Sequence, residues 1–294
     1  MEPVRVLSSV VGEFLCWSRM RFAPATVELQ AHYLQRFVEH VGQISIDHVT
    51  RLHVENFSVR KHPLEVVKHF LTWCVEVAEL LPKNPALKVA VPKSGRRSRI
   101  LTPIERARIR RAAGPELRAL LVVMEETAAR PAEARALTWQ SLRGLDVAAL
   151  RSSSPLARPA YFELSKYKGM TRRTNPNYKR LLPVSPRLWK LLCRLGRGLD
   201  ELRGPILRSS TGRAWTANAY RCSFRRMRLR LTTVDQVGLV GYLYRHTKAT
   251  ELARSGVNAR LLADFLGHAS LDLLSWYVHP SEADLCELVW PRVP

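Results

Sequence analysis

Apolar residues recur three and four positions apart through most of the first ninety residues, the spacing of one buried helix face. The clearest stretches are residues 5–19, 25–41 and about 62–80. Polar residues fill the positions between them, so each helix would have one face to bury and one to expose. We therefore expect residues 1–92 to form a small domain that is helical throughout.

The periodicity stops at residues 93–100, where Ser and Gly stand among Lys93, Arg96, Arg97 and Arg99. This composition is typical of a connection and unlike that of a packed element. Closely spaced cations in an extended chain can follow DNA phosphates. We expect a basic linker that contacts DNA, and a linker that is merely solvated is the alternative.

A second pattern begins at Thr102, a candidate helix cap followed by Pro103 and by Glu105 three residues on. Apolar spacing predicts helices at 103–113, 116–129, 186–195, 216–231, 245–256, 258–266 and 271–277. Two stretches predict strands, 159–165 and 179–184, separated by a polar turn. Residues 101–294 should thus be a larger domain, mainly α with a small β-ribbon, in an α+β class.

Charge points to the partner. The 294 residues hold 47 Lys and Arg against 25 Asp and Glu, a formal net charge of +22. Such an excess favours a polyanionic partner, with nucleic acid first. An anionic membrane surface is second, but no basic amphipathic helix flanks an apolar anchor.

Composition also bears on location. No apolar run approaches the roughly 18 to 20 residues of a membrane span. The first residues do not resemble a signal peptide, and the five cysteines are scattered. We expect a cytoplasmic protein with no membrane partner.

Two segments of the second domain hold candidate chemistry, and each is ambiguous alone. In residues 127–139, Arg130, Glu133 and Leu137 recur at helical spacing, which a structural ion pair would also explain. Lys166 and Lys168 stand at the turn between the expected strands, where ordinary surface lysines are common.

Two further segments lie near the end. Arg245 stands at an expected helix start, and His268 follows a Leu-Gly turn. Tyr277 comes nine residues after His268 and next to Trp276, so both could be core or interface aromatics.

Taken together and in this order, the four segments resemble the tyrosine recombinases, the phage integrase family. That family carries R-x-x-E-x-x-x-L, a hairpin lysine, H-x-L-R-H-T, L-G-H and a tyrosine nine residues past that histidine. The corresponding positions are Arg130, Glu133, Leu137, Lys168 or Lys166, Arg245, His268 and Tyr277. The helical domain also resembles the family's SAM-like core-binding domain, so the resemblance covers nearly the whole chain.

The resemblance implies a mechanism. Tyr277 would attack a DNA phosphate, displace a 5′-hydroxyl and form a 3′-phosphotyrosine, without ATP. Arg130 and Arg245 would grip the phosphate oxygens, which suits bidentate guanidiniums. A lysine, Lys168 or Lys166, would protonate the leaving oxygen, and His268 would hydrogen-bond the phosphate. No metal or other cofactor is expected, and no carboxylate cluster suggests one.

One position departs from the family pattern. Tyr242 stands where a histidine is usual, three residues before Arg245. In the family that histidine is thought to help deprotonate the nucleophile. Tyr242 is a poor base but can donate a hydrogen bond to phosphate. His246 or His279 could take the histidine's place.

A basic helix is the remaining candidate DNA contact. Arg221, Arg225 and Arg228 share one face of the helix expected at 216–231, and apolar residues form another. The basic face could grip phosphates or simply keep the protein soluble.

The resemblance also implies a tetramer on two DNA duplexes, bearing a recombination site and held together by C-terminal segments. The alternative is that each C-terminal segment packs on its own domain. Two other functions stay open, namely a non-catalytic architectural DNA-binding protein and a relaxing enzyme like type IB topoisomerase.

Overall fold

The computed structural model describes residues 5–92, 99–164, 178–268, 270–271 and 274. The chain divides into two compact units, Met1–Arg96 and Arg97–Pro294. Each unit has its own apolar core. The described part of the chain contains no helix long and apolar enough to cross a membrane.

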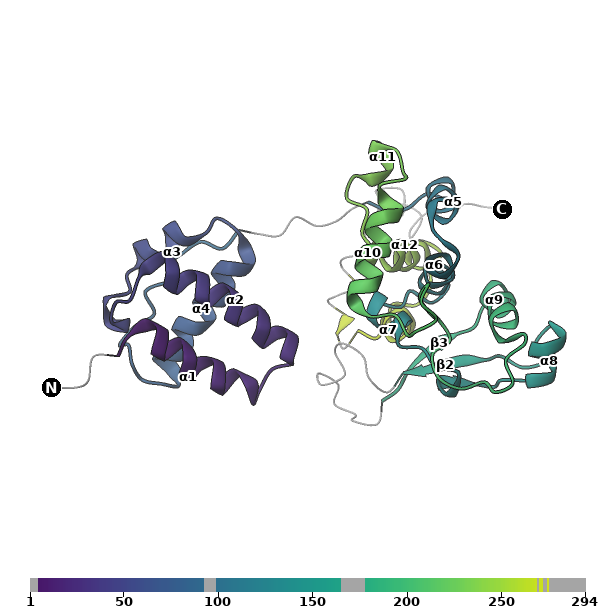
Figure 1. Cartoon of the computed structure of the whole chain (residues 1–294), viewed down its shortest axis with the longest axis horizontal. Coiled ribbons are helices and arrows are strands. Elements are labelled where there is room, and N and C mark those ends of the chain that lie inside the picture. Colours follow the sequence, from purple (N-terminus) through teal and green to yellow (C-terminus); the bar gives the residue numbers. More distant parts are fainter. Residues whose placement is uncertain (1–4, 93–98, 165–177, 269, 272–273, 275–294) are drawn as a thin grey trace, which may run out of the picture. The chain divides into compact units, whose positions relative to one another are not determined.

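The first unit is helical, as the periodicity predicted (Figure 1). Its helices are α1 Leu7–Arg19, α2 Pro24–Val41, α3 Arg51–Phe57 and α4 Lys61–Glu76, with a 3₁₀ turn at Ile46–His48. Phe14, Phe37 and Phe70 are fully buried between them. Burial of such side chains stabilises the unit by about 1.5 to 3 kcal/mol each.

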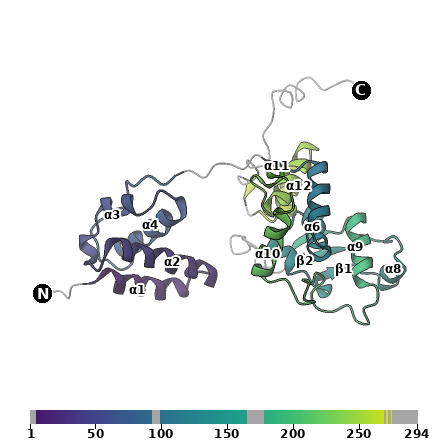
Figure 2. The same ribbon diagram turned by 45° about the horizontal axis from the view of Figure 1, so that its top comes forward.

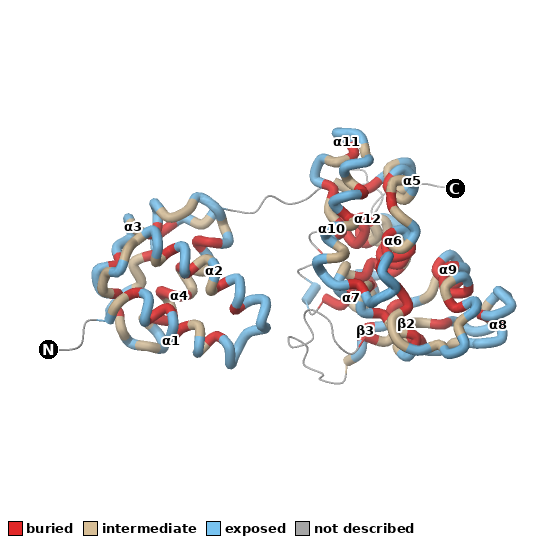
Figure 3. The backbone as a smooth tube through the Cα atoms, in the orientation of Figure 1, coloured by how far each residue is buried: buried red, intermediate tan, exposed pale blue. Residues whose placement is uncertain are grey.

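The second unit is built around α6 (Pro115–Thr127), which contacts helices on several sides (Figure 2). These neighbours are α5 Pro103–Ala112, α7 Pro131–Arg135, α9 Pro186–Gly196, α10 Ala217–Arg228 and α12 Tyr242–Arg254. Figure 3 shows buried positions along much of α6, where Leu120, Leu121 and Met124 are fully or almost fully enclosed. Shorter elements complete the unit: a 3₁₀ turn at Trp139–Ser141, α8 Val147–Ser152, α11 Thr233–Gln236 and α13 Ala259–Leu266.

The sheet has three antiparallel strands in the order β1-β2-β3, so the prediction of a two-stranded ribbon was incomplete. The strands are β1 Leu142–Arg143, β2 Tyr161–Leu164 and β3 Arg180–Pro183. β1 has only two residues and therefore shows no alternation that a sequence pattern could detect. In β3, Arg180 pairs with Leu164 and Leu182 with Phe162, and both Arg180 and Leu182 point inward.

Local signals placed several helix ends correctly. Thr102 caps α5 through the backbone N–H of Glu105, and the Glu105 carboxylate accepts from the N–H of Thr102. Gly267 ends α13 in the left-handed conformation, with φ +65°.

Other boundaries were wrong. α12 begins at Tyr242 instead of residue 245, so Arg245 lies at the end of its first turn. α7 has five residues, so Arg130 precedes it and Leu137 follows it; the helical spacing of the motif does not reflect one helix. The expected helix at 271–277 lies mostly outside the described residues.

Candidate active site

Several predicted site residues lie outside the described part of the chain. They are Tyr277, Lys166, Lys168, Lys93, Arg96, Arg97 and the candidate base His279. The roles expected for these residues remain predictions. The described residues do hold Arg130, Glu133, Arg245 and His268, and the structure brings these four together.

The first part of the site is the turn between α6 and α7. Ala128 ends α6 with φ +51°, a left-handed conformation that costs a residue with a Cβ about 1 to 2 kcal/mol. The side chain of Thr127 supports the turn by donating to the carbonyl of Val123 and accepting from the N–H of Ala129. Because the chain reverses direction at Ala128, the Ala128 carbonyl can accept from Arg245 while the Arg130 side chain binds Glu133.

Arg130 and Glu133 form a tight ion pair at the start of α7. Arg130 Nη1 donates to Glu133 Oε1 at 2.7 Å, and the Arg130 backbone N–H donates to Oε2 at 2.8 Å. The Arg130 side chain keeps 19% of its surface exposed, whereas the Glu133 side chain keeps 4%. Glu133 therefore holds both the backbone N–H and the guanidinium of Arg130, and part of the Arg130 side chain stays exposed.

A second arginine, Arg180 of β3, binds the same carboxylate. Its Nη1 donates to Glu133 Oε2 at 2.5 Å, and its side chain is fully buried. Burial alone would raise the pKa of Glu133, but the guanidiniums of Arg180 and Arg130 outweigh burial and hold that pKa below its usual value. Burial also lowers the pKa of Arg180, to about 10, which leaves it charged at neutral pH.

The second part of the site contains Arg245 and His268. Arg245 is fully buried, and its two terminal nitrogens donate to the carbonyls of Ala128, at 3.0 Å, and Leu266, at 2.5 Å. Its Nη2 also lies 3.0 Å from Nε2 of His268. Because arginine has no acceptor, Nε2 must accept this hydrogen bond, which places the proton of a neutral His268 ring on Nδ1.

The cluster carries more positive than negative charge. Arg130, Arg180 and Arg245 bring three guanidiniums, and Glu133 is the carboxylate that pairs with two of them. Among the described residues of this cluster, three guanidiniums thus stand against one carboxylate, and such an excess of buried positive charge favours an anionic ligand. Among the described residues, no group of three or more His, Cys, Asp or Glu side chains could hold a metal ion.

Sequence reasoning missed Arg180. Next to Lys179 it looks like ordinary surface charge, yet it is buried and Lys179 is exposed. A signal was present, because Arg180 has the same parity along the strand as the inward-pointing Leu182. Parity indicates the face on which Arg180 lies, but its partners come from α7 and α13, which the local sequence does not reveal.

Tyr242 and His246, the candidates around the missing histidine, differ in exposure. Tyr242 is the first residue of α12 and is 37% exposed. His246 is 7% exposed, within the buried part of the same helix. Of the two, Tyr242 is thus the more accessible to DNA, and its role there remains a prediction.

The predicted DNA contacts fall into two groups. Arg221 and Arg225 are exposed on α10, and Phe224 and Met227 are buried on another face of it, so the predicted packing face is confirmed. Arg228 is half-buried, and its Nη2 donates to the carbonyl of Gln236 at 3.4 Å.

Arg99 differs from the exposed linker cation that composition predicted. It forms a 2.5 Å ion pair with Glu105 and also hydrogen-bonds the carbonyl of Val237. Only 26% of its side-chain surface is exposed. These contacts anchor the start of the second unit, so Arg99 has a structural role there whether or not it touches DNA.

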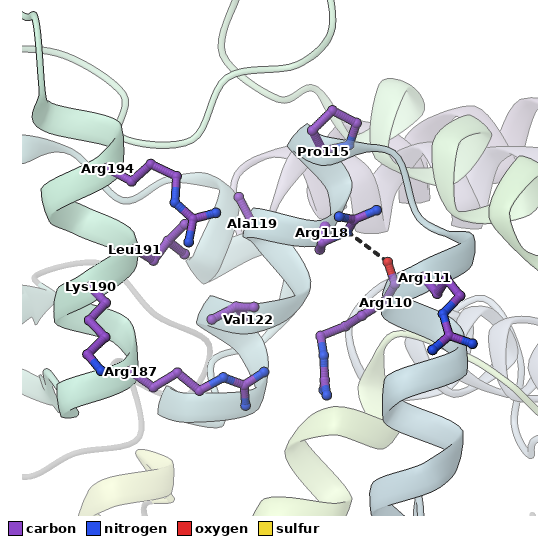
Figure 4. Close-up of a pocket in the computed structure, with 10 residues that line it drawn as sticks. All are labelled: Arg110, Arg111, Pro115, Arg118, Ala119, Val122, Arg187, Lys190, Leu191 and Arg194. Atoms are coloured by element: carbon purple, nitrogen blue, oxygen red, sulfur yellow. Dashed lines mark hydrogen bonds between the residues drawn. The ribbon is translucent and has the colours of Figure 1, made fainter.

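A separate basic groove of about 540 Å³ lies between α9 and the α5–α6 pair (Figure 4). Its cations are Arg110, Arg111, Arg118, Arg187, Lys190 and Arg194. The residues described above, Arg130, Glu133, Arg180, Arg245 and His268, form what we call the arginine–histidine cluster. None of them lines the groove. Its charges add to the positive field that attracts a polyanion to this unit.

Comparisons with known proteins agree on fold and family. The chain matches the sequence profile of the phage integrase family over residues 99–284. It is similar to the Tn1549 transposon integrase solved with a circular intermediate DNA, at 16% identity and TM-score 0.69, covering 96% of this chain and 98% of that one. At these identities the structural similarity shows a shared fold.

Lambda integrase gives two further matches. A dimer bound to a COC′ core site has 15% identity and TM-score 0.68, covering 92% of this chain and 77% of that one. A tetramer bound to a Holliday junction has 14% identity and TM-score 0.68, covering 95% and 78%. No curated protein matches the sequence.

Proposed function

Because the chain belongs to the phage integrase family, as its motifs predicted, we propose that it is a site-specific DNA recombinase that cleaves and rejoins DNA through Tyr277. The observation that carries the proposal is the convergence of Arg130, Arg245 and His268 in one cluster with excess positive charge. A DNA phosphate matches such a cluster in charge, and guanidiniums can bind its oxygens in bidentate fashion.

The chemistry is a phosphoryl transfer in two reversible steps. The Tyr277 hydroxyl oxygen attacks phosphorus, and the bond from phosphorus to the 5′-oxygen breaks. The phenol proton leaves to a base, and the 5′-oxygen takes a proton from a lysine, Lys168 or Lys166. A 5′-hydroxyl of another strand then attacks the 3′-phosphotyrosine and releases Tyr277. The phosphodiester count is conserved, so no ATP is required.

The arginines stabilise the transition state. Its non-bridging oxygens carry more negative charge than those of the ground state, so fixed donors there bind it more strongly. Two carbonyls and His268 fix the plane of the Arg245 guanidinium, and Glu133 fixes Arg130. Since Nε2 of His268 accepts from Arg245, Nδ1–H is the atom that would donate to a phosphate oxygen.

The same charge offers a route to the nucleophile. Nearby cations lower the pKa of a tyrosine by stabilising its phenolate. Tyr277 brought beside Arg130 and Arg245 would therefore need less help from a base. This accounts for Tyr242 in place of a histidine, with Tyr242 donating a hydrogen bond to the phosphate.

The assembly we propose is a tetramer on two duplexes. The lambda integrase matched above was solved as a tetramer bound to a Holliday junction. Strand exchange requires two cleaved duplexes held together, which a single subunit cannot supply. The C-terminal residues after Tyr277 are the proposed contact between subunits.

A nicked substrate tests the proposal. A binding site is selected from the DNA that flanks the gene or from a random duplex library, and a nick is placed so that the cleaved end diffuses away. We expect a protein–DNA adduct that survives SDS in the wild type and is absent in Tyr277→Phe. No adduct on a site that the protein binds would support the alternative favoured by Tyr242, a non-catalytic DNA-binding protein.

A further inference from the structure

Arg180 links the two parts of the arginine–histidine cluster, the Arg130–Glu133 pair and the segment that carries His268. From β3, its Nη1 reaches Glu133 at the start of α7, and its Nε donates to the carbonyl of Phe265 at 2.9 Å. Glu133 in turn holds Arg130, whereas Phe265 lies three residues before His268 at the end of α13. One buried guanidinium therefore spans segments that are more than a hundred residues apart in sequence.

Close packing strengthens the link on the histidine side. A Cβ added to Gly267 would lie 2.5 Å from Cδ of Arg180, so the turn before His268 rests directly on the arginine's aliphatic chain. Gly267 also has φ +65°, a conformation that favours glycine. Beside it, the Tyr178 hydroxyl donates to Asp264 at 3.1 Å, which ties the residues before β3 to the same helix end.

A purely structural cation would not need this placement. Burial of a guanidinium is costly, and an apolar side chain of similar volume often serves stability equally well. Here Arg180 binds Oε2 of Glu133 while Nη1 of Arg130 binds Oε1. The arrangement fixes the direction of the Glu133 carboxylate, and with it the direction of Arg130.

We propose that Arg180 is a positioning residue for strand transfer, holding Arg130 and His268 at the separation that a phosphate requires. The inference rests on the proposed function. Arg180 is fully buried, so it acts through Glu133 and the Phe265–His268 turn. Loss of the link should therefore slow chemistry while leaving DNA affinity largely intact.

Single-turnover cleavage of the nicked substrate provides the kinetic test. We expect Arg180→Met to cleave about 100-fold more slowly, the effect typical of misplacing catalytic groups by about 1 Å. The DNA concentration for half-maximal rate should change less than threefold. Arg180→Lys keeps the charge but not the two-nitrogen geometry, so it should restore only part of the rate.

Arg143→Met is the matched control. Arg143 lies on β1 of the same sheet and pairs with Glu163 at 3.6 Å, away from the cluster. Its cleavage rate should stay within twofold of the wild type. If Arg180→Met, folded and bound to DNA, cleaves as fast as Arg143→Met, the inference is wrong and the proposed function still stands.

A double-mutant cycle guards against a general loss of structure. If Arg180 acts through Glu133, Arg180→Met combined with Glu133→Gln should cleave no more than about twofold more slowly than the worse single variant. If the double variant is slowed by the product of the two single-variant factors, the two residues act independently and the inference is wrong. Gly267→Ala, which presses on Arg180 without removing it, should also slow cleavage.

A titration separates this inference from the proposed function. The pKa of the Glu133 carboxylate, followed by carbon-13 NMR in the intact protein, should rise in Arg180→Met and not in Arg143→Met. This result is expected even if no covalent adduct forms. An unchanged Glu133 pKa would overturn the link whatever the protein does to DNA.

Discussion

At the residue scale, the important feature of the cluster is that its described residues include three arginines and one carboxylate, which two of the arginines share. Glu133 accepts from Arg130 and Arg180, and Arg245 is held by backbone carbonyls and His268. Neutral carbonyls fix the orientation of Arg245 without cancelling its charge. The cluster is thus rigid and still electropositive, which is what stabilisation of an anionic transition state requires.

Arg130 offers the clearest test of bidentate recognition. In Arg130→Lys the charge remains but the planar fork is lost, so we expect single-turnover cleavage to fall by about 100- to 1,000-fold. Affinity for the site should change much less, because DNA binding is shared among many phosphate contacts. Cleavage within threefold of the wild type would contradict the role assigned to Arg130.

Glu133 makes a prediction about pH. Its folded pKa lies below the unfolded value of 4.5, so its charge stabilises the protein above that value, and this contribution fades as pH falls through the folded pKa. Removing the charge in Glu133→Gln leaves Arg180 buried without its partner. We expect a loss of about 3 to 5 kcal/mol in unfolding free energy near pH 7.

The difference between wild type and Glu133→Gln should stay nearly constant from pH 7 down to about 4.5 and shrink below that value. Urea unfolding at several pH values measures it, with the m-values compared to check that both proteins unfold in the same way. A difference that grows on acidification would mean that the folded pKa is raised and not lowered.

Motif spacing could predict site residues that lie close together in sequence, but not those whose partners are distant in sequence. Spacing identified Arg130, Glu133, Arg245 and His268, because the motif lies in three short stretches of sequence. Arg180 escaped, since its two partners lie 47 and 85 residues away. Arg99 was misassigned because composition shows that a cation is present but not that Glu105 neutralises it.

At the element scale, periodicity predicted the longer helices, and caps such as Thr102 predicted where they begin. α8, α11 and β1 were missed because six, four and two residues are too few to show a period. Arg130, Glu133 and Leu137 have helical spacing, but Arg130 precedes α7 because Ala128 reverses the chain. A long-range hydrogen bond from Arg245 to the Ala128 carbonyl and a local one from the Arg130 N–H to Glu133 support that turn.

The segment between β2 and β3 contains both candidate general acids. A substrate with sulfur in place of the bridging 5′-oxygen separates proton donation from other effects, because a thiolate leaves without a proton. We expect Lys168→Ala to slow cleavage of normal DNA at least tenfold and to cleave the sulfur substrate about as fast as the wild type. Lys166→Ala is the matched comparison.

The outcome assigns the acid. If Lys166→Ala alone shows the defect and the rescue, the acid is Lys166. If neither variant is impaired on normal DNA, protonation by this segment is excluded. A defect that persists with sulfur would indicate a role in binding or positioning.

At the scale of the whole molecule, a net charge of +22 predicts binding that weakens steeply with salt. Arg221 and Arg225 are exposed on α10 and are the described cations that we expect to meet phosphates. Their joint replacement by alanine should reduce the log–log salt slope by about 0.9 for each phosphate that the variant no longer neutralises. Titrations at a series of potassium concentrations give the slope.

Arg203→Ala supplies the control for that measurement. Arg203 is 77% exposed but pairs with Glu201 in a loop outside α10. Its replacement removes one charge and should leave the slope nearly unchanged. Equal effects of the α10 and Arg203 variants would show that net charge alone governs binding.

The central claim is that Tyr277 becomes joined to DNA through a 3′-phosphate. The most direct measurement is mass spectrometry of the peptide that carries the nucleotide after wild-type protein is trapped on a nicked site, with a metal chelator present throughout. We expect a single modified peptide, with the nucleotide on Tyr277 through its 3′-phosphate. A nucleotide on another residue, a 5′-linkage, or no adduct on a site that the protein binds would contradict it.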